Sequence, residues 1–376
     1  MADKENLVDT TKTEQLETGQ NTTKEETENL KDSKKINEQE SESEEEIEDP
    51  EKTKLFKKLE EFYDEYYLSD FQKFAVGKFV KDKISNPKDE KVDRLRDWLM
   101  YKLNKKRPPG HKDQMGCPEI IPKLTAKPFY DKEDFPWIAE IEANYEEIKE
   151  EVIKLRGEKG FQPYRGPSWI SDIKAKDGIG RKSTDSGEWN VCYLKLHNLK
   201  FDENCKKLPF LMSILKEHLP RQYNHTFLSA MNPDTHILKH YGPTNKKLRF
   251  HLPLFGIDGS RLRVHDQVKH LKPGEAYVFD DSFEHEAWHD GKDTRVILIA
   301  DFWHFDLTND EIKLLEMLQN ARMKFEKNIS AKDPDRDNFY SVIEDSKDIL
   351  DGTDWWTVNE EELKQAKKCA EEKVSE

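Results

Sequence analysis

Histidine and arginine side chains in the segment 240–295 have the types and spacing that a metal-and-anion site needs. His240 is followed by the turn sequence Gly-Pro-Thr-Asn, and His285 follows the stretch Asp-Asp-Ser-Phe-Glu. Neutral imidazoles bind iron, nickel, zinc or copper, so ligand type alone does not select the metal. The common Fe(II) triad adds a carboxylate two residues after its first histidine, and this chain has Gly242 at that position.

Asp281, four residues before His285, allows two interpretations. In the first, its carboxylate accepts a hydrogen bond from a water on the metal and so supports catalysis. In the second, it is an ordinary turn residue, because Asp is common where strands are connected. The sequence alone does not distinguish between these two roles.

Cationic side chains on two strand-like segments predict an anion site beside the histidines. In the strand-like sequence Lys247-Leu-Arg249-Phe-His251, a period of two places the three polar side chains on one face. Arg295 lies within a run of Val, Ile, Leu and Ala. A buried guanidinium without a partner is very costly, so Arg295 needs a carboxylate from a ligand or from the protein itself, for instance Asp280 or Asp301.

The elements that must position these residues are short strands preceded by helices. Alternating hydrophobicity and Gly- or Asp-rich turns predict strands over 226–231, 247–255, 261–265, 276–279, 285–288 and 294–303. Asp134 as a capping carboxylate, Pro136 in the first turn and Gly157 as the terminator predict one helix over 137–155, and a second helix is predicted over 208–219. This order predicts an α+β fold around a β-sandwich or small barrel.

The composition divides the 376 residues into four regions. We predict a disordered acidic arm over 1–50, a helical region with a linker over 51–120, the main domain over 121–306, and a helical, charged extension over 307–376. Aromatic residues of 55–103 are expected to pack these helices on the main domain, and Trp355 and Trp356 to dock on it as well. A formal net charge of −15 argues against a nucleic-acid partner.

The chain has no hydrophobic run long enough for a signal peptide or a membrane span, so neither is expected. Its four cysteines have no CxxC spacing, which predicts free thiols rather than disulfides or a zinc site. Free thiols are typical of a reducing compartment, and the sequence therefore predicts a cytoplasmic protein.

Residues 226–304 resemble the aspartyl/asparaginyl β-hydroxylase family, a branch of the Fe(II)- and 2-oxoglutarate-dependent dioxygenases. The resemblance implies a double-stranded β-helix core, also called a jelly-roll or cupin-like fold, with flanking N-terminal helices. The matching motifs are Ser229-Ala-Met231, His240-Tyr-Gly-Pro-Thr-Asn245, Leu248-Arg249-Phe-His251-Leu, Phe279-Asp-Asp-Ser-Phe-Glu-His285-Glu, Arg295, and Phe302-Trp303-His304. Weaker similarity reaches back to Pro122.

The resemblance also implies a role for each site residue. His240 and His285 become the iron ligands, and Asp281 joins them as a catalytic residue near the gap at Gly242, which is typical of this family. Arg295 is expected to pair with the distal carboxylate of 2-oxoglutarate. The expected cosubstrate pocket is completed by Ser229, Met231, Arg249 and His251. Lys247 stands where relatives use an arginine to bind a substrate carboxylate, so it is the expected substrate-binding residue.

The implied reaction uses O₂, converts 2-oxoglutarate to succinate and CO₂, and hydroxylates the β-carbon of an Asp or Asn residue in a peptide or protein. Bacterial relatives that act on lipid acyl chains keep an acyl or small-molecule substrate as an alternative. Two further hypotheses stay open: a non-oxidative cupin-like metal enzyme or anion-binding protein, and a catalytically silent interaction protein that works through its acidic arm.

Overall fold

A computed structural model describes residues 50–86, 88–167, 170–175, 180–197, 199–330, 350, 352–358 and 364. The predicted acidic arm, apart from Pro50, lies outside these residues, as does 331–349 of the predicted C-terminal extension. The chain divides into two units, 1–54 and 55–376, and the description below concerns the second unit. No helix in the described ranges is both long enough and apolar enough to cross a membrane.

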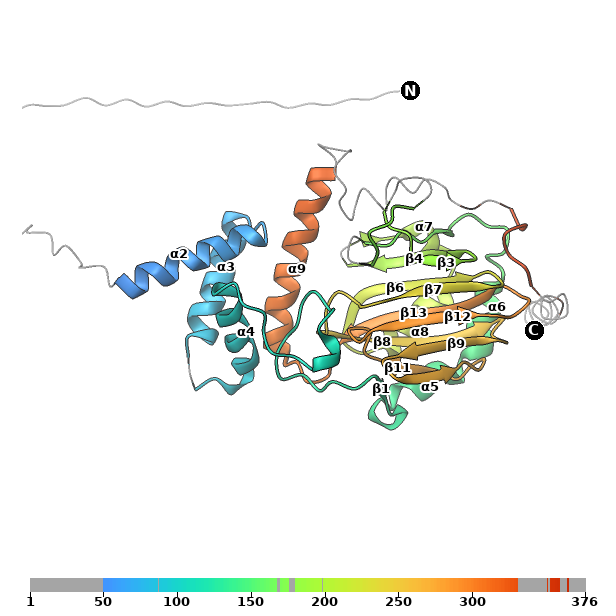
Figure 1. The fold of residues 1–376 in the computed structure, drawn as a ribbon, viewed down its shortest axis with the longest axis horizontal. Helices are drawn as coiled ribbons and strands as arrows, with labels where there is room; N and C mark the ends of the chain where they lie inside the picture. Colours follow the sequence, from blue (N-terminus) through green and yellow to red (C-terminus); the bar gives the residue numbers. More distant parts are fainter. Residues whose placement is uncertain are drawn as a thin grey trace, which may run out of the picture. The chain divides into compact units, whose positions relative to one another are not determined.

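Two antiparallel sheets face each other in the described part of the chain (Figure 1). The larger sheet has the order β1-β11-β8-β13-β6-β4-β2, with β5 paired to β4, and the smaller sheet has the order β10-β9-β12-β7-β3. The strands are β1 (Phe129–Tyr130), β2 (Gln162–Pro163), β3 (Thr184–Ser186), β4 (Trp189–Leu196), β5 (Leu199–Lys200), β6 (Gln222–Met231), β7 (Thr235–His240), β8 (Lys247–Phe255), β9 (Ser260–Val264), β10 (Gln267–His270), β11 (Tyr277–Phe279), β12 (His285–His289) and β13 (Arg295–Trp303). This topology confirms the predicted α+β, jelly-roll-type core.

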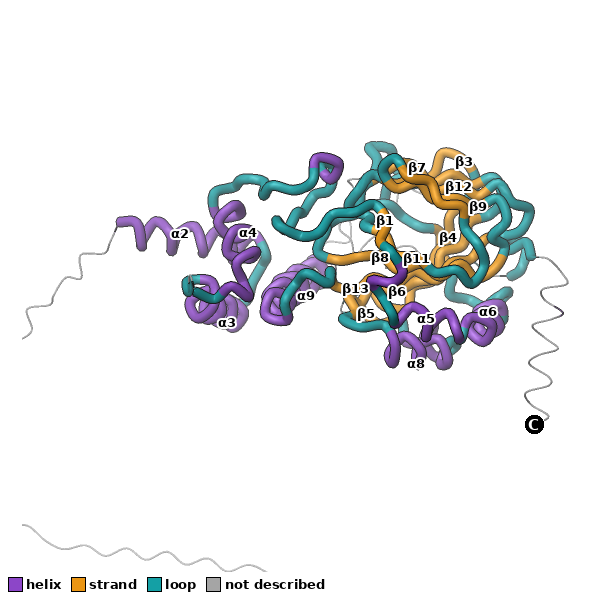
Figure 2. The backbone as a smooth tube through the Cα atoms, turned by 90° about the horizontal axis from the view of Figure 1, so that it is seen from below, coloured by secondary structure: helices purple, strands orange, loops and turns teal. Residues whose placement is uncertain are grey.

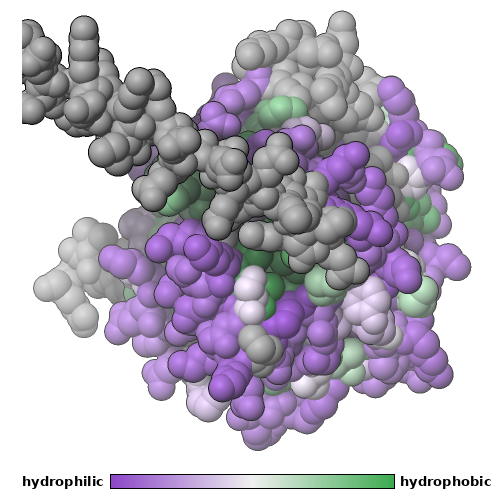
Figure 3. Space-filling view, turned by 90° about the vertical axis from the view of Figure 1, so that its left-hand side faces the viewer, coloured by the Kyte–Doolittle hydropathy of each residue, from purple (hydrophilic) through white to green (hydrophobic). Residues whose placement is uncertain are grey.

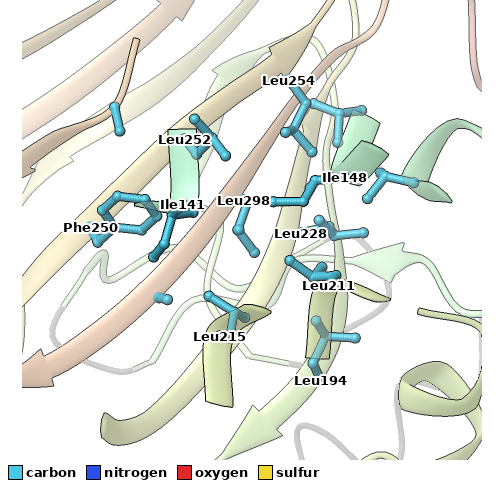
Figure 4. Packing of buried hydrophobic residues seen from close by; sticks show 14 of the residues in the cluster. Ile141, Ile148, Leu194, Leu211, Leu215, Leu228, Phe250, Leu252, Leu254 and Leu298 are labelled. Atoms are coloured by element: carbon cyan, nitrogen blue, oxygen red, sulfur yellow. The ribbon is translucent and has the colours of Figure 1, made fainter. Parts of the chain in front are cut away.

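The predicted alternation on β8 is confirmed. Leu248, Phe250 and Leu252 belong to a buried apolar cluster on the outer face of the larger sheet, whereas Lys247 and Arg249 contact carboxylates on the opposite face. Helices α5 (Trp137–Ala143), α6 (Tyr145–Ile153) and α8 (Pro209–His218) cover the outer face, and the smaller sheet lies on the other side (Figures 2 and 4). The larger sheet is therefore apolar toward its helices and carries its charged groups between the two sheets.

The single helix predicted over 137–155 is wrong in detail. The chain forms α5 (Trp137–Ala143) and α6 (Tyr145–Ile153), which are separated at Asn144. The Asn144 side chain donates a 2.8 Å hydrogen bond to the Glu140 carbonyl, and such local bonds compete with a continuous helix. Asp134 does not cap α5, because it belongs to a short 3-10 turn, η4 (Lys132–Asp134). The second predicted helix is confirmed as α8 (Pro209–His218), and α7 (Asp202–Lys206) precedes it.

The helices that precede and follow the sandwich in the sequence pack together as one helical wall. We define this wall as α2 (Pro50–Glu65), α3 (Asp70–Phe79), α4 (Asp93–Leu103) and α9 (Asn309–Ser330). Short turns η1 (Val80–Ile84), η2 (Glu90–Val92) and η3 (Lys112–Gln114) connect or follow its first three helices. Phe62, Trp98 and Leu315 share one buried cluster with Tyr223 and Trp303 of the larger sheet. The prediction that the N-terminal helices pack on the main domain is confirmed.

Trp356 returns to the outer face of the larger sheet, as predicted. Its side chain is only 1% exposed, and its ring lies 5.6 Å from that of Phe255 at an interplanar angle of 14°. Phe161 contacts it edge-on at 5.3 Å. This segment therefore completes the apolar core beneath β8.

Candidate functional site

His240 and His285 face each other from the neighbouring strands β7 and β12. They are register partners, and their ring centroids are 4.2 Å apart. The Nδ1 atoms lie 2.6 Å from the Leu238 carbonyl and 2.9 Å from the Phe283 carbonyl, so each Nδ1–H donates a hydrogen bond and each Nε2 keeps its lone pair. Burial lowers the pKa of both rings, that of His285 strongly, which keeps them neutral as metal ligation requires.

Gly242 lets the Asp281 carboxylate lie against the loop that follows His240. A Cβ at position 242 would lie 2.5 Å from the Asp281 Cγ atom, so only glycine fits. The backbone N–H of Gly242 also donates a 2.6 Å hydrogen bond to the Asp281 carbonyl. The space that a side chain at position 242 would fill is thus occupied by the Asp281 carboxylate, which comes from a different loop.

Asp281 lies in a turn, but its side chain is buried in the site. Its Oδ2 atom is 2.6 Å from the Lys247 ammonium, while its buried Oδ1 atom has no hydrogen-bond partner. That oxygen is free to accept a hydrogen bond from a ligand or a water. Over the described ranges, no group of three His, Cys, Asp or Glu side chains has metal-binding geometry.

Lys247 and Arg249 are both paired with carboxylates of the protein. Lys247 lies 3.0 Å from Asp301, and Arg249 forms a two-pronged pair with Asp301 at 2.8 and 2.9 Å. Burial would raise the pKa of Asp301, but Arg249 and Lys247 hold it well below its usual range. The roles of Lys247 in substrate binding and of Arg249 in cosubstrate binding stay predictions. In either role the cation would have to bind a ligand carboxylate while it remains paired with a carboxylate of the protein.

Arg295 is a buried guanidinium without a counter-ion among the described residues. It is 3% exposed, its Nη2 donates a 3.3 Å hydrogen bond to the Ser229 hydroxyl, and its Nε has no partner. Burial lowers its pKa to about 10. Neither carboxylate proposed as an internal partner reaches it, because Asp301 pairs with Arg249 and Asp280 accepts hydrogen bonds from Gln114 and Ser282. The Arg295 guanidinium can therefore pair with a negatively charged group of a ligand.

His251 and Tyr277 complete the surroundings of Arg295. The Nδ1 atom of His251 lies 2.8 Å from the Tyr277 hydroxyl, and its buried Nε2 atom has no partner. The Tyr277 phenol in turn interacts electrostatically with Arg295. Met231, also predicted for the cosubstrate pocket, is fully buried and is the register partner of Arg295.

Sequence reasoning missed Tyr277, Trp189 and Gln114. Tyr277 is the register partner of His251 on β11, and the Trp189 indole N–H donates a 3.0 Å hydrogen bond to the Ser229 hydroxyl. Gln114 donates hydrogen bonds of 2.9 Å to Asp280 and 2.8 Å to Ser282, which fixes the loop before His285. An alternation count on the 277–279 strand would have indicated Tyr277, whereas nothing local marks Gln114.

A cleft of about 740 Å³ connects this site to the helical wall. His240, Gly242 and Asp281 line one part of it, and residues of α4 and α9 line another. Arg295 and His285 do not belong to the lining and lie deeper between the sheets. His240 is thus reached from the side of the sandwich that faces the helical wall.

The sequence that carries this site matches a known protein family. The model of the family described as aspartyl/asparaginyl beta-hydroxylase matches residues 142–305, which include His240, His285 and Arg295. Residues 142–305 belong to the aspartyl/asparaginyl β-hydroxylase family. The resemblance that the motifs of 226–304 predict is confirmed, and the family match begins at residue 142, short of the weaker similarity predicted back to Pro122.

Individual named proteins are similar to this chain over about half its length. An ornithine lipid ester-linked acyl 2-hydroxylase of Rhizobium tropici is 35% identical over 183 residues, which cover 48% of this chain and 62% of the relative. The aspartyl/asparaginyl beta-hydroxylase of Mus musculus is 30% identical, covering 48% of this chain and 25% of the relative. Human aspartate beta-hydroxylase domain-containing protein 2 is 30% identical, covering 54% of each chain.

Proposed function

We propose that this protein is an Fe(II)- and 2-oxoglutarate-dependent hydroxylase that oxidises the β-carbon of an Asp or Asn residue in a peptide or protein. The observation that carries the proposal is Arg295, a buried cation with no counter-ion in the described structure, which lies on the larger sheet and faces the smaller sheet that carries the pair of neutral histidines. A dicarboxylate that reaches a metal at the histidines and ends at Arg295 would satisfy both. Membership of 142–305 in the hydroxylase family supports the same reaction class.

The residues present fit both groups. His240 and His285 would hold iron through their Nε2 atoms, and the Asp281 Oδ1 atom, which has no partner, would accept a hydrogen bond from a water beside it. Arg295 and Ser229 would hold the distal carboxylate of 2-oxoglutarate. Bound together, Fe(II) and 2-oxoglutarate would supply O₂-dependent oxidation of a C–H bond, with release of succinate and CO₂.

The work of the chain itself is positioning and exclusion of water. Backbone carbonyls at Leu238 and Phe283 fix the rotation of the two imidazoles. The Lys247–Asp281 contact of 2.6 Å fixes the carboxylate next to Gly242. Because these groups are held before any ligand arrives, little reorganisation is needed when the ligands bind.

The test is formation of succinate from 2-oxoglutarate with Fe(II) and O₂, measured in the presence of candidate peptides. We expect His240→Ala to abolish it and Arg295→Met to raise the KM for 2-oxoglutarate about 100-fold or more. Arg261→Met, which alters a partly exposed arginine paired with Asp290, is the matched control and should leave the activity unchanged. Consumption of peptide without O₂ would favour the non-oxidative alternative.

An acyl-chain hydroxylase is the second candidate, because the Rhizobium relative at 35% identity is named as an acyl 2-hydroxylase. The two candidates share the iron and cosubstrate groups and differ only in the oxidised substrate. Mass spectrometry of lysates incubated with active or His285→Ala protein separates them. One added oxygen atom on peptides supports the proposed function, and the same addition confined to lipids supports the alternative.

A further inference from the structure

The helical wall forms a side of the cleft that the matched family segment does not supply. Tyr66, Tyr67 and Trp98 line the cleft from the N-terminal helices, and Gln319 and Phe325 line it from α9. All five lie outside residues 142–305. Figure 3 views the molecule from the side of these helices, where some hydrophobic residues show within a largely hydrophilic surface. Recognition features on this wall therefore belong to this chain rather than to the shared catalytic segment.

Polar atoms without partners are spread along the cleft. Trp98 is fully buried and its indole N–H has no acceptor. On α9, the buried Gln319 Oε1 and Glu326 Oε2 atoms have no donor, although the other polar atoms of both side chains are bonded. On the opposite side, the Arg181 Nε–H also lacks an acceptor. The cleft thus offers both donors and acceptors to whatever fills it.

This pattern favours a polypeptide over an acyl chain. Every peptide unit carries one N–H donor and one C=O acceptor, so an extended segment can satisfy both kinds of group along its length. An acyl chain has no polar atom beyond its ester and would leave the same groups buried and unpaired. The cleft volume of about 740 Å³ also exceeds what a single amino acid fills.

Tyr67 and Phe325 form an apolar shelf at the helical side of this cleft. Their rings stack with centroids 3.5 Å apart and planes 3° apart, and Tyr67 keeps 43% of its surface exposed. Tyr67 has φ +55°, directly after α2, at a position where helices usually place glycine. A non-glycine residue held in this conformation is typical of ligand-binding positions, where the side chain has a use.

We infer that the cleft binds an extended polypeptide, with Trp98, Gln319 and Glu326 bonding to its backbone and the Tyr67–Phe325 shelf binding one aromatic or large aliphatic side chain. The inference rests on the proposed hydroxylase function. It adds that residues of the helical wall set a sequence preference at a fixed distance from the hydroxylated residue. The full chain thus recognises the substrate at a second position, away from the histidine pair.

The experiment uses the full chain with Fe(II), 2-oxoglutarate and O₂. The probe is a library of peptides of about 15 residues, roughly 50 Å when extended, with a central Asp or Asn and randomised flanks. Peptides that gain one oxygen atom are sequenced. We expect aromatic or large aliphatic residues to be enriched at one flanking position, and Tyr67→Gly to remove this enrichment and raise the KM of a matching peptide about tenfold with kcat unchanged.

Two further variants make the result specific. Trp98→Phe keeps an aromatic ring in the core but removes the N–H together with part of the indole ring, and it should raise the KM of all peptides about five- to tenfold, whatever their flanking residue. Phe71→Ala removes a ring that is 79% exposed and does not line the cleft, and it should behave as wild type. Tyr67→Gly suits the φ of that position, so folding should be preserved.

Several outcomes would overturn the inference. They are hydroxylation without any flanking preference, a preference that Tyr67→Gly leaves intact, or oxidation confined to phosphatidylcholine vesicles offered in parallel. In the first two cases peptides are still hydroxylated, so the proposed function stands, whereas oxidation confined to the vesicles supports the acyl-chain alternative. If neither peptides nor vesicles stimulate succinate formation, and 2-oxoglutarate fails to bind, the proposed function itself is contradicted.

Discussion

The Asp281 carboxylate lies in the space where Gly242 lacks a side chain, with its Cγ atom 2.5 Å from the position of a Cβ. Position 242 therefore carries no carboxylate, and the neighbouring loop provides that of Asp281, which Lys247 holds at 2.6 Å. The arrangement leaves His240 and His285 as the proposed metal-binding pair and makes position 242 sensitive to the smallest substitution.

We expect Gly242→Ala to displace Asp281, because the added methyl group has no space. Overpacking of this kind should lower the free energy of unfolding by about 1–3 kcal/mol. The shift of the carboxylate should lower kcat about 10- to 100-fold. Chemical denaturation and succinate formation measure the two effects. The double variant Gly242→Asp with Asp281→Gly returns a carboxylate to the same space and should recover part of the metal affinity that Gly242→Asp alone loses.

Arg295→Met should stabilise the ligand-free protein. The wild-type side chain is a buried charge without a counter-ion, and its replacement by an apolar side chain of similar length should raise the free energy of unfolding by about 1–3 kcal/mol. The same variant should lose the increase in Tm that 2-oxoglutarate gives the iron-loaded wild type. A destabilised ligand-free variant would show that Arg295 has an internal partner after all.

Arg249→Met should have the opposite effect on stability. It leaves Asp301, which is fully buried, with Lys247 as its remaining strong cation partner at 3.0 Å. Breaking a buried pair from one side typically costs about 3–5 kcal/mol. Urea denaturation of Arg249→Met and of Arg249→Met with Asp301→Asn checks this. The second substitution should restore part of the loss, and a failure to do so would argue against the charge as the cause.

His304 should make stability depend on pH. Burial lowers its pKa from 6.5 to about 4, and the neutral ring donates from Nε2 to the Thr125 carbonyl and accepts at Nδ1 from the Asp306 N–H. Below pH 6.5 the unfolded chain binds a proton that the folded chain does not. Stability is therefore fully present above this pH and falls toward pH 4, by up to about 3 kcal/mol. Urea denaturation at pH 7 and 4.5 measures the difference, and His304→Gln should reduce it without removing it, because the lowered pKa values of His240 and His285 act in the same direction.

Local patterns predicted those elements whose residues alternate cleanly. β8 was predicted with its observed bounds, because its polar and apolar residues alternate and turns border it. β4 was missed, because six of its eight residues are buried, which leaves little contrast between its two faces. The break at Asn144 was also missed, since it depends on a side chain bonding to its own backbone. Periodicity finds an element more easily than its interruptions.

The partners of the site residues were less predictable than the residues themselves. The motifs identified His240, His285 and Arg295, but the Arg249–Asp301 pair follows from the register of β8 and β13, 52 residues apart in the chain. The helical wall is more remote still, since Arg94 contacts Glu311 across 217 positions. Long-range pairing of this kind leaves no local signal, so the cleft could not be anticipated from the sequence.

The measurement that tests the central claim most directly is isothermal calorimetry of 2-oxoglutarate binding to the iron-loaded protein in the absence of O₂. The account predicts tight binding to wild type and to the control Arg261→Met, and a loss of about 100-fold or more in both His240→Ala and Arg295→Met. Equal affinity in all four proteins would contradict the assignment of the histidine pair and the buried arginine to one site.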